Sequence, residues 1–396
     1  MTILTGGRII TPDAVLDSHE LLIDGGEIVE IRETAPASVP ADTQTADIVH
    51  LGGAYVAPGF IDLHSDYIEH MAAPRPTTLM DFSLALRVAE REMLTHGITT
   101  MYHSLALYSF SEFGGSAPIR SPENTRALAM AIDKTRKGRH LIRHRFHARF
   151  EIDNIKRTEE VAGYIAEGKV HLVSFMDHTP GQGQYRDLEI YRKTLKGYRN
   201  LSDEQVDTII ELSRGREKLT LKTMAEIAEL ARGAGIAVAS HDDDGLAKLE
   251  LMKEVGAGIS EFPTTVEVAL EARRRGMHTV AGAPNVLLGG SHSGNLSARE
   301  AILAGGVDVL CSDYYPPALL HAVFALADRG DLSLPAAMRL VTLNPALAVG
   351  LEDDFGSIEA GKRADLICVE QLEDGFPVVS GAYIDGREVL CVRHHY

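Results

Sequence analysis

Short apolar runs alternate with amphipathic stretches through the middle of the chain. The apolar runs predict strands over residues 54–64, 98–103, 144–151, 171–177, 236–241, 258–262, 278–283 and 307–313. Between these strands, residues 82–96, 124–137, 204–232 and 265–275 are typical of helices. Strands that alternate with helices favour a parallel sheet. Eight such strands predict an α/β fold, a (β/α)8 TIM-like barrel.

The two ends of the chain show a different pattern, of short strands joined by tight turns. Residues 21–23 and 28–31 flank the hairpin signal Asp24-Gly25-Gly26-Glu27, and Asp385-Gly386 marks a similar turn near the C-terminus. We expect residues 1–54 and 355–396 to form one small β-sandwich domain. Residues 55–354 would then form the barrel, and 396 residues suit a barrel of roughly 250 residues with a small module.

Composition limits the classes of function. The net charge of −17 argues against non-specific binding to nucleic acid or membranes, although a basic pocket for an anionic small molecule remains compatible with it. No apolar run is long enough to span a bilayer, and the N-terminus does not resemble a secretory signal. Three widely spaced cysteines fit a reducing compartment. We therefore expect a cytoplasmic protein, either a monomer or a homodimer.

Potential metal ligands stand at or near the ends of the predicted strands. They are His64, Asp66, Glu151, His178, His241 and Asp313. Carboxyl ends of parallel strands meet on one face of a barrel, where such enzymes carry their chemistry. Imidazole and carboxylate ligands suit zinc, manganese or iron. Glu151 could bridge two ions, so the sequence predicts one or two divalent ions, with Asp313 accepting the proton of an activated water.

Other polar residues nearby have more than one interpretation. We interpret His103 and His147 as hydrogen-bonded core histidines. The run Asp242 to Asp244 is typical of a solvated loop, but one of its carboxylates could orient His241. Glu261 stands at another strand end, and a role in the pocket is left open.

Longer motifs carry a resemblance to known families. VAPGFIDLHSD and GSIEAGKRADL resemble the amidohydrolase superfamily, with Asp66 where that superfamily normally has histidine and Glu151 where it often has a modified lysine. Superfamily ligands commonly lie on strands one, four, five, six and eight. Our count puts Glu151, His178 and His241 on strands three, four and five.

A narrower resemblance is to the PhnM family of phosphonate metabolism. It is carried by LHSDYIEHMAAPRP, SFMDHTPGQGQY, ASHDDD, EFPTTVEVA, GAPNVLLGGSHSGNLSA and CSDYYPPALLHA. The resemblance implies a metal-dependent diphosphatase of the carbon–phosphorus lyase pathway. Such an enzyme hydrolyses α-D-ribose 1-methylphosphonate 5-triphosphate to the 5-phosphate and diphosphate. It also implies that the six residues above form the metal site.

Several segments suit a phosphorylated sugar. GGSHSGN, residues 289–295, follows a predicted strand and precedes a predicted helix at 296–303, so Gly290, Ser291, His292 and Ser293 could cradle phosphate. Arg75 and Arg149 could supply guanidinium groups, and Tyr314 could contact phosphate or ribose. A second glycine-rich loop, residues 178–185, could cover the substrate.

Two other classes of function remain open at this point. A C–N hydrolase, such as a deaminase, deacetylase or cyclic amidase, would use the same barrel and metals, because fold does not fix the substrate. A non-catalytic binding protein could also retain the fold, although near-complete retention of the ligand set argues against it.

Overall fold

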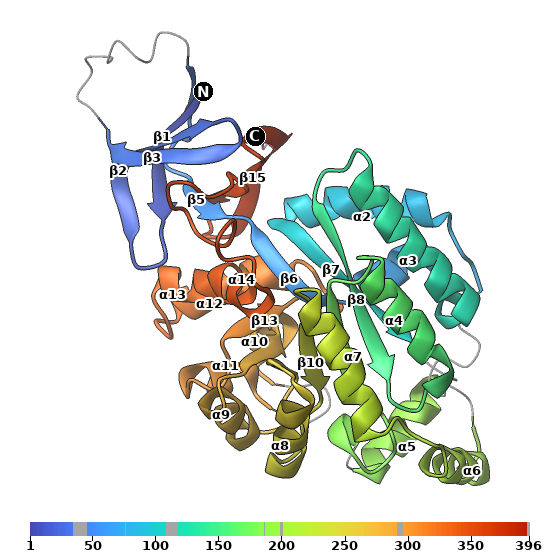
Figure 1. The fold of residues 1–396 in the computed structure, drawn as a ribbon. Coiled ribbons are helices and arrows are strands. Elements are labelled where there is room, and N and C mark those ends of the chain that lie inside the picture. Colours follow the sequence, from blue (N-terminus) through green and yellow to red (C-terminus); the bar gives the residue numbers. More distant parts are fainter. Residues whose placement is uncertain are drawn as a thin grey trace.

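The computed structural model describes residues 1–34, 46–75, 77–107, 118–185, 187–198, 201–290 and 296–393. Two β-sheets organise this part of the chain: a parallel barrel from the middle, and a mixed sheet from both ends. In Figure 1 the mixed sheet lies at one side of the barrel.

The barrel contains eight parallel strands in sequential order. They are β6 (Phe60–Ser65), β7 (Ile98–Leu107), β8 (Arg143–Glu151), β9 (Leu172–Met176), β10 (Ala237–His241), β11 (Ile259–Glu261), β12 (His278–Gly282) and β13 (Val309–Cys311). A parallel bridge between Ser65 and Asp313 brings the last strand beside the first. The predicted barrel is confirmed, and so is the strand count that assigns Glu151, His178 and His241 to strands three, four and five.

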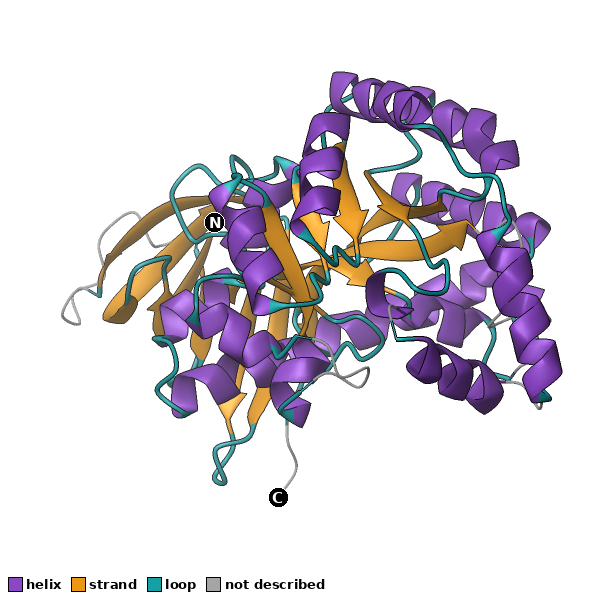
Figure 2. Cartoon of the chain, turned by 90° about the horizontal axis from the view of Figure 1, so that it is seen from below, coloured by secondary structure: helices purple, strands orange, loops and turns teal. Residues whose placement is uncertain are grey.

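Helices surround the barrel, as Figures 1 and 2 show. They are α1 (Tyr67–Ala72), α2 (Phe82–Thr95), α3 (Pro122–Lys137), α4 (Thr158–Ala166), α5 (Leu188–Tyr198), α6 (Asp203–Arg214), α7 (Leu221–Gly233), α8 (Leu246–Val255), α9 (Val266–Arg274), α10 (Ala283–Leu288), α11 (Ala298–Leu303), α12 (Ala318–Asp328), α13 (Leu334–Arg339) and α14 (Leu343–Val349). Inside the barrel, Leu63, Tyr102, Leu172 and Val280 belong to one buried cluster. Because this cluster fills the interior, the chemistry has to lie at the strand ends.

The second sheet joins strands from both ends of the chain. It contains β1 (Thr2–Ile10), β2 (Val15–Asp24), β3 (Glu27–Glu33), β4 (Asp47–His50), β5 (Tyr55–Pro58), β14 (Leu366–Gln371), β15 (Pro377–Ile384) and β16 (Arg387–Cys391). Both predicted hairpins form, β2–β3 and β15–β16. The division at residues 54/55 and 354/355 stays a prediction, since β5 pairs with both β1 and β14.

Two elements that were predicted as continuous are each divided in two, so those two predictions are wrong. The strand expected over 54–64 is divided at Gly59 into β5 and β6, which belong to different sheets. The helix expected over 204–232 is divided into α6 and α7, because α6 ends at Gly215 and Thr220 caps the start of α7. The other helices, predicted over 82–96, 124–137 and 265–275, correspond to α2, α3 and α9.

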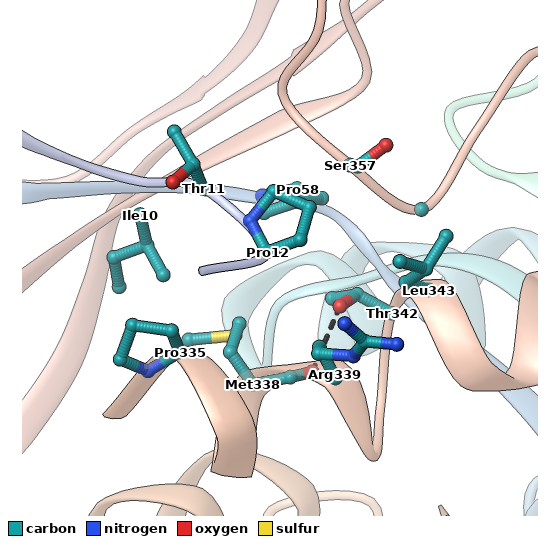
Figure 3. Close-up of a pocket in the computed structure, with 11 residues that line it drawn as sticks. Ile10, Thr11, Pro12, Pro58, Pro335, Met338, Arg339, Thr342, Leu343 and Ser357 are labelled. Carbon is teal, nitrogen blue, oxygen red and sulfur yellow. Dashed lines mark hydrogen bonds between the residues drawn. The ribbon is translucent and has the colours of Figure 1, made fainter. Parts of the chain in front are cut away.

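A small cavity lies between the terminal sheet and the segment α13–α14 (Figure 3). Ile10, Pro58, Met338 and Thr342 are among its lining residues, and its volume is about 10 Å³. The backbone of Ile61, near the start of β6, bonds to Val341, so the cavity lies near the amino end of the barrel. Its size excludes a substrate. Separately, none of the helices among the described residues has the length and apolar character needed to cross a membrane.

Candidate metal centre

Polar side chains gather at the carboxyl ends of the barrel strands. His64 lies in β6, Glu151 ends β8, His241 ends β10 and Glu261 ends β11, while His178 and Asp313 each follow a strand by two residues. The strands β9 (LVSFM) and β13 (VLC) are buried throughout, and β10 (AVASH) is buried from its second residue, so the polar residues that end or follow these strands fall where the barrel opens. The sequence thereby puts a ring of ligand-type side chains on one face.

One possible ligand group consists of His64, His241 and Glu261. One ligand atom from each lies within 4.8 Å of the others. His64 Nδ1 is 3.0 Å from Glu261 Oε1, and His147 Nε2 is 3.8 Å from the same oxygen. Burial alone would raise the pKa of Glu261, but His147 and His64 outweigh it and bring that pKa to about 2. Glu261 is therefore a buried carboxylate that carries its charge at neutral pH.

A second possible group shares His241 and adds His178 and Asp242. Asp242 Oδ2 lies 3.1 Å from His241 Nδ1 and 3.6 Å from His178 Nε2. Burial alone would raise the pKa of Asp242, yet the two histidines bring it to about 2. The other ring nitrogen of His178 hydrogen-bonds with Glu151. Burial lowers the pKa of His178, but Glu151 outweighs that effect and raises it above its ordinary value.

Several buried polar atoms at this point make no hydrogen bond within the described structure. They are both ring nitrogens of His241, Oδ2 of Asp242 and Oε2 of Glu261. Buried polar atoms are normally satisfied, and each exception needs an explanation. A divalent cation would supply the missing partner for imidazole and carboxylate atoms at once. The residues present therefore fit the metal that such a donor set implies.

The turns that follow three of these strands have unusual backbone conformations. Asp242, Phe262 and Asp313 have φ of 53°, 53° and 58°, in the left-handed region. Non-glycine residues rarely adopt that region, and those that do gather at functional sites. The Phe262 ring packs edge-on against His64, with centroids 4.9 Å apart, and lies 5.2 Å from the His241 ring. Phe262 thus limits the access of water to one side of the two imidazoles.

Asp66 and Asp313 lie side by side in the backbone but have different partners. Asp66 N donates to Asp313 O at 2.7 Å, and Asp313 N donates to His64 O at 3.0 Å. Arg149 donates a hydrogen bond to the Asp66 carboxylate. Burial would raise the pKa of Asp66, but Arg149 outweighs it and holds that pKa well below its usual range. Burial and repulsion from Asp66 raise the pKa of Asp313 to about 7.

The structure therefore brings all six predicted ligand residues to one mouth of the barrel, in unequal positions. His64, His178 and His241 supply atoms to the two compact groups, whereas Glu151 contacts His178 and Asp66 contacts Arg149. Glu261 and Asp242 also belong to the groups, although no firm role was predicted for either residue. The signal for Glu261 was its place at the end of strand six, which follows the same rule as the other ligands.

The three consecutive aspartates have three different surroundings. Asp242 faces the histidines, whereas Asp243 accepts hydrogen bonds from Ser240 and Ser260. Asp244 accepts a hydrogen bond from Gly183 N at 2.8 Å, in the glycine-rich loop after β9. Asp242 and Asp243 are therefore buried at the end of the barrel. The identity of the three residues alone had suggested a solvated loop instead.

The predicted substrate-binding residues are also distributed unequally. Arg149 is buried at the mouth, Arg75 is exposed on the loop after α1, and Tyr314 follows Asp313 with 41% of its surface exposed. Gly290 follows strand seven, β12, but the helix α10 lies between them and begins directly after β12, with a proline in its first turn. Ser291, His292 and Ser293 lie outside the described residues.

Comparison with known proteins agrees with this fold. Residues 55–389 match the model of the amidohydrolase family, and the chain belongs to that family. It is 37% identical, over 397 residues, to the α-D-ribose 1-methylphosphonate 5-triphosphate diphosphatase of Escherichia coli K12, covering 98% of this chain and 100% of that enzyme. Adenine deaminase 3 of Rhizobium meliloti 1021 is 34% identical over 164 residues, which are 38% of this chain and 26% of the deaminase.

Solved structures of low sequence identity share the fold. The N-acetylglucosamine-6-phosphate deacetylase of Pasteurella multocida has a TM-score of 0.65 at 13% identity, covering 98% of this chain and 99% of that one. A D-hydantoinase has a TM-score of 0.63 at 16% identity, covering 98% and 95%. At these identities the likeness concerns architecture alone, since one barrel serves many substrates.

Proposed function

We propose that this protein is a metal-dependent diphosphatase acting on α-D-ribose 1-methylphosphonate 5-triphosphate in phosphonate catabolism. Water would add across the anhydride between the first and second phosphoryl groups, giving the 5-phosphate and diphosphate. The observation that supports this most is the 37% identity to the E. coli diphosphatase along the whole of both chains. The buried histidine–carboxylate cluster at the barrel mouth supports the hydrolytic chemistry.

The proposed metal centre lies around His241. His64, His178 and His241 would supply imidazoles, and carboxylates would come from Glu261 and Asp242, with Glu151 and Asp313 beside them. This donor set suits one or two divalent ions, and zinc is the first to test, with manganese or iron next. A bound ion would lower the pKa of water at the site and offset charge on phosphoryl oxygens.

The chain's own residues would then prepare the reaction. Asp313, held by backbone bonds to His64 and Asp66, would accept the proton from the attacking water. Arg149 would place positive charge beside the phosphoryl oxygens, which attract guanidinium groups strongly. Tyr314 and the glycine-rich segment at Gly290 would contact the rest of the substrate. Phe262 would keep bulk water from the imidazoles.

The test is product identity. Purified protein loaded with zinc or manganese would be incubated with the triphosphate, and phosphorus NMR would follow the 5-phosphate and diphosphate. We expect both products in equal amounts, loss of activity with a chelator, and recovery on metal addition. His241→Ala should lose both metal and turnover, whereas replacing the exposed His50 by Ala should change neither.

A C–N hydrolase is the alternative that the same experiment addresses. The partial match to adenine deaminase 3 supports considering it, although that match covers only 38% of this chain. Ammonia from adenine, or acetate from N-acetylglucosamine 6-phosphate, without diphosphate release from the triphosphate would favour this alternative and reject the diphosphatase.

A further inference from the structure

Asp66 occupies the position where the superfamily resemblance leads one to expect a second strand-one histidine. In the structure its carboxylate is bound to Arg149 and contributes no atom to either group of potential ligands. Its exposed side-chain fraction is 23%, and that of Arg149 is 8%. A carboxylate already engaged by a buried guanidinium has less capacity to coordinate a cation.

Arg149 is directed to the mouth by its place in β8. Residues at alternate positions of a strand point to the same face, so His147, Arg149 and Glu151 share one side of β8. His147 approaches Glu261, and Glu151 hydrogen-bonds with His178. Arg149 stands between these two contacts, with its Nε 3.2 Å from the sulfur of Met176 at the end of β9. The guanidinium of Arg149 is therefore held in place beside the potential metal ligands.

A second ion pair adjoins the first. Arg120 Nε lies 2.8 Å from Glu69 Oε2, and Glu69 is buried in α1, three residues after Asp66. Two carboxylates are thus matched by two guanidinium groups, and the charge of Asp66 is balanced without a metal ion.

We propose that Asp66 is a positioning residue for Arg149, and that the guanidinium, rather than a second metal ion, is the fixed positive charge beside the metal. The centre would then hold a single divalent ion, with Arg149 binding an anionic phosphoryl group of the substrate. This inference deepens the proposed function and rests on it for the identity of the substrate.

Metal content tests the role of Asp66 without any turnover. Wild type, Asp66→Asn and His241→Ala would be equilibrated with buffered zinc, freed of excess metal, and analysed by elemental mass spectrometry. We expect one zinc per chain in wild type and in Asp66→Asn, and loss of zinc in His241→Ala. Two ions in wild type, or loss of zinc in Asp66→Asn, would overturn the proposal.

Binding of diphosphate tests Arg149, because diphosphate carries the same phosphoryl chemistry. Calorimetry on the zinc-loaded protein should show about a ten- to a hundredfold weaker affinity in Arg149→Met, since one charge-assisted contact is lost. Arg149→Lys should retain part of the affinity. Asp66→Asn should weaken binding with unchanged zinc content, and Asp66→Glu should restore it in part.

The matched control is Arg145→Met, which removes an arginine from the opposite end of the same strand and should leave diphosphate affinity unchanged. Where Arg149→Met does not fold, Arg149→Lys and the Asp66 variants decide the question. Absence of diphosphate binding in wild type, or equal affinity in the Arg149 variants, would reject the anion-binding role. Failure of the proposed function would instead appear as no diphosphate release, with the zinc content and affinities as expected.

Discussion

Asp66 and Asp313 lie side by side at the mouth of the barrel, but their different partners suit them to different roles. Asp66 is held by Arg149, whereas Asp313 sits in a left-handed turn, directed by backbone bonds to His64 and Asp66. A proton acceptor has to be held within reach of the reacting water, and its carboxylate has to be available to the proton. The residue-scale geometry therefore favours Asp313 for that task.

Asp313→Asn tests this assignment, because the amide keeps the size of the side chain and removes its ability to accept the proton. We expect turnover of the triphosphate to fall about a hundredfold or more, with zinc content largely intact. Stopped assays of diphosphate release and elemental analysis measure the two quantities. Turnover equal to wild type would remove Asp313 from the mechanism.

At the scale of elements, β8 serves both the site and the packing around the barrel. His147, Arg149 and Glu151 face the mouth, while His144 forms a buried polar chain with residues of β7 and α2. His103 Nε2 lies 2.8 Å from His144 Nδ1, and His144 Nε2 lies 3.2 Å from Glu90 Oε2. The same strand therefore carries both residues of the site and His144, which joins a buried chain of polar side chains from β7 and α2.

The two buried histidines of this chain, His103 and His144, predict a pH dependence of stability. Burial lowers the pKa of His144, and burial together with the charge of His144 lowers that of His103 further. Below about pH 6.5 the unfolded chain binds protons that the folded chain resists, so stability falls as pH decreases toward the lowered values. Each such histidine contributes a slope of up to about 1.4 kcal/mol per pH unit.

Urea unfolding at pH 7 and pH 5 measures this slope. His103→Gln should make the free energy of unfolding depend less on pH, whereas His50→Gln, at an exposed position, should not change the dependence. An equal slope in His103→Gln and wild type would show that the buried histidine does not cause it.

The junction between β5 and β6 depends on Gly59. A Cβ there would lie 2.1 Å from Thr99 Oγ1 and 2.2 Å from Thr99 Cγ2, in the buried start of β7. Gly59→Ala should lower the free energy of unfolding by about 1–3 kcal/mol, because the crowded Thr99 has to move. Gly163→Ala in α4 is the control, since a Cβ there meets no described atom within 4 Å outside its own stretch of helix, and alanine favours helix.

Thermal or urea unfolding measures both glycine variants. Thr99→Ala combined with Gly59→Ala should recover part of the loss. Stability of Gly59→Ala equal to that of wild type would mean that the two sheets meet without the close approach described.

For the molecule as a whole, the sequence predicts architecture better than it predicts roles. Eight apolar runs and two glycine turns were sufficient for the barrel and the terminal hairpins, because periodicity and turn chemistry are local properties. Gly59 and Gly215 interrupt patterns that looked continuous. The break at Gly59 depends on its close approach to Thr99, and the break at Gly215 is followed by a helix cap at Thr220. A search for local periodicity takes neither contact into account.

The candidate site shows the same limit. The rule that ligands stand at strand ends brings His64, His178 and His241 together. It cannot tell which of Asp242, Asp243 and Asp244 faces the histidines, because that depends on partners elsewhere in the barrel. Likewise, nothing in the sequence around Asp66 shows that Arg149, 83 residues later, binds its carboxylate. Such pairings are set by the register of the closed barrel.

The two sheets are tied by a charged contact that should make them unfold together. Arg143, at the start of β8, pairs with Asp365 at 2.7 Å and with Asp385 at 2.6 Å, both from the C-terminal part of the second sheet. Asp365 is 5% exposed, so Arg143→Met leaves a buried carboxylate without its ion-pair partner. We expect the free energy of unfolding to fall by about 3 kcal/mol.

Arg192→Met provides the contrast, because its ion pair with Asp207 is exposed and solvent already screens it. Its unfolding midpoint should equal that of wild type, while Arg143→Met should unfold earlier by calorimetry, with zinc content unchanged before unfolding. Equal midpoints for the two variants would mean that apolar packing alone joins the sheets. A lower midpoint for Arg143→Met only would show that residues about 220 positions apart, Arg143 and Asp365, hold the barrel to the terminal sheet.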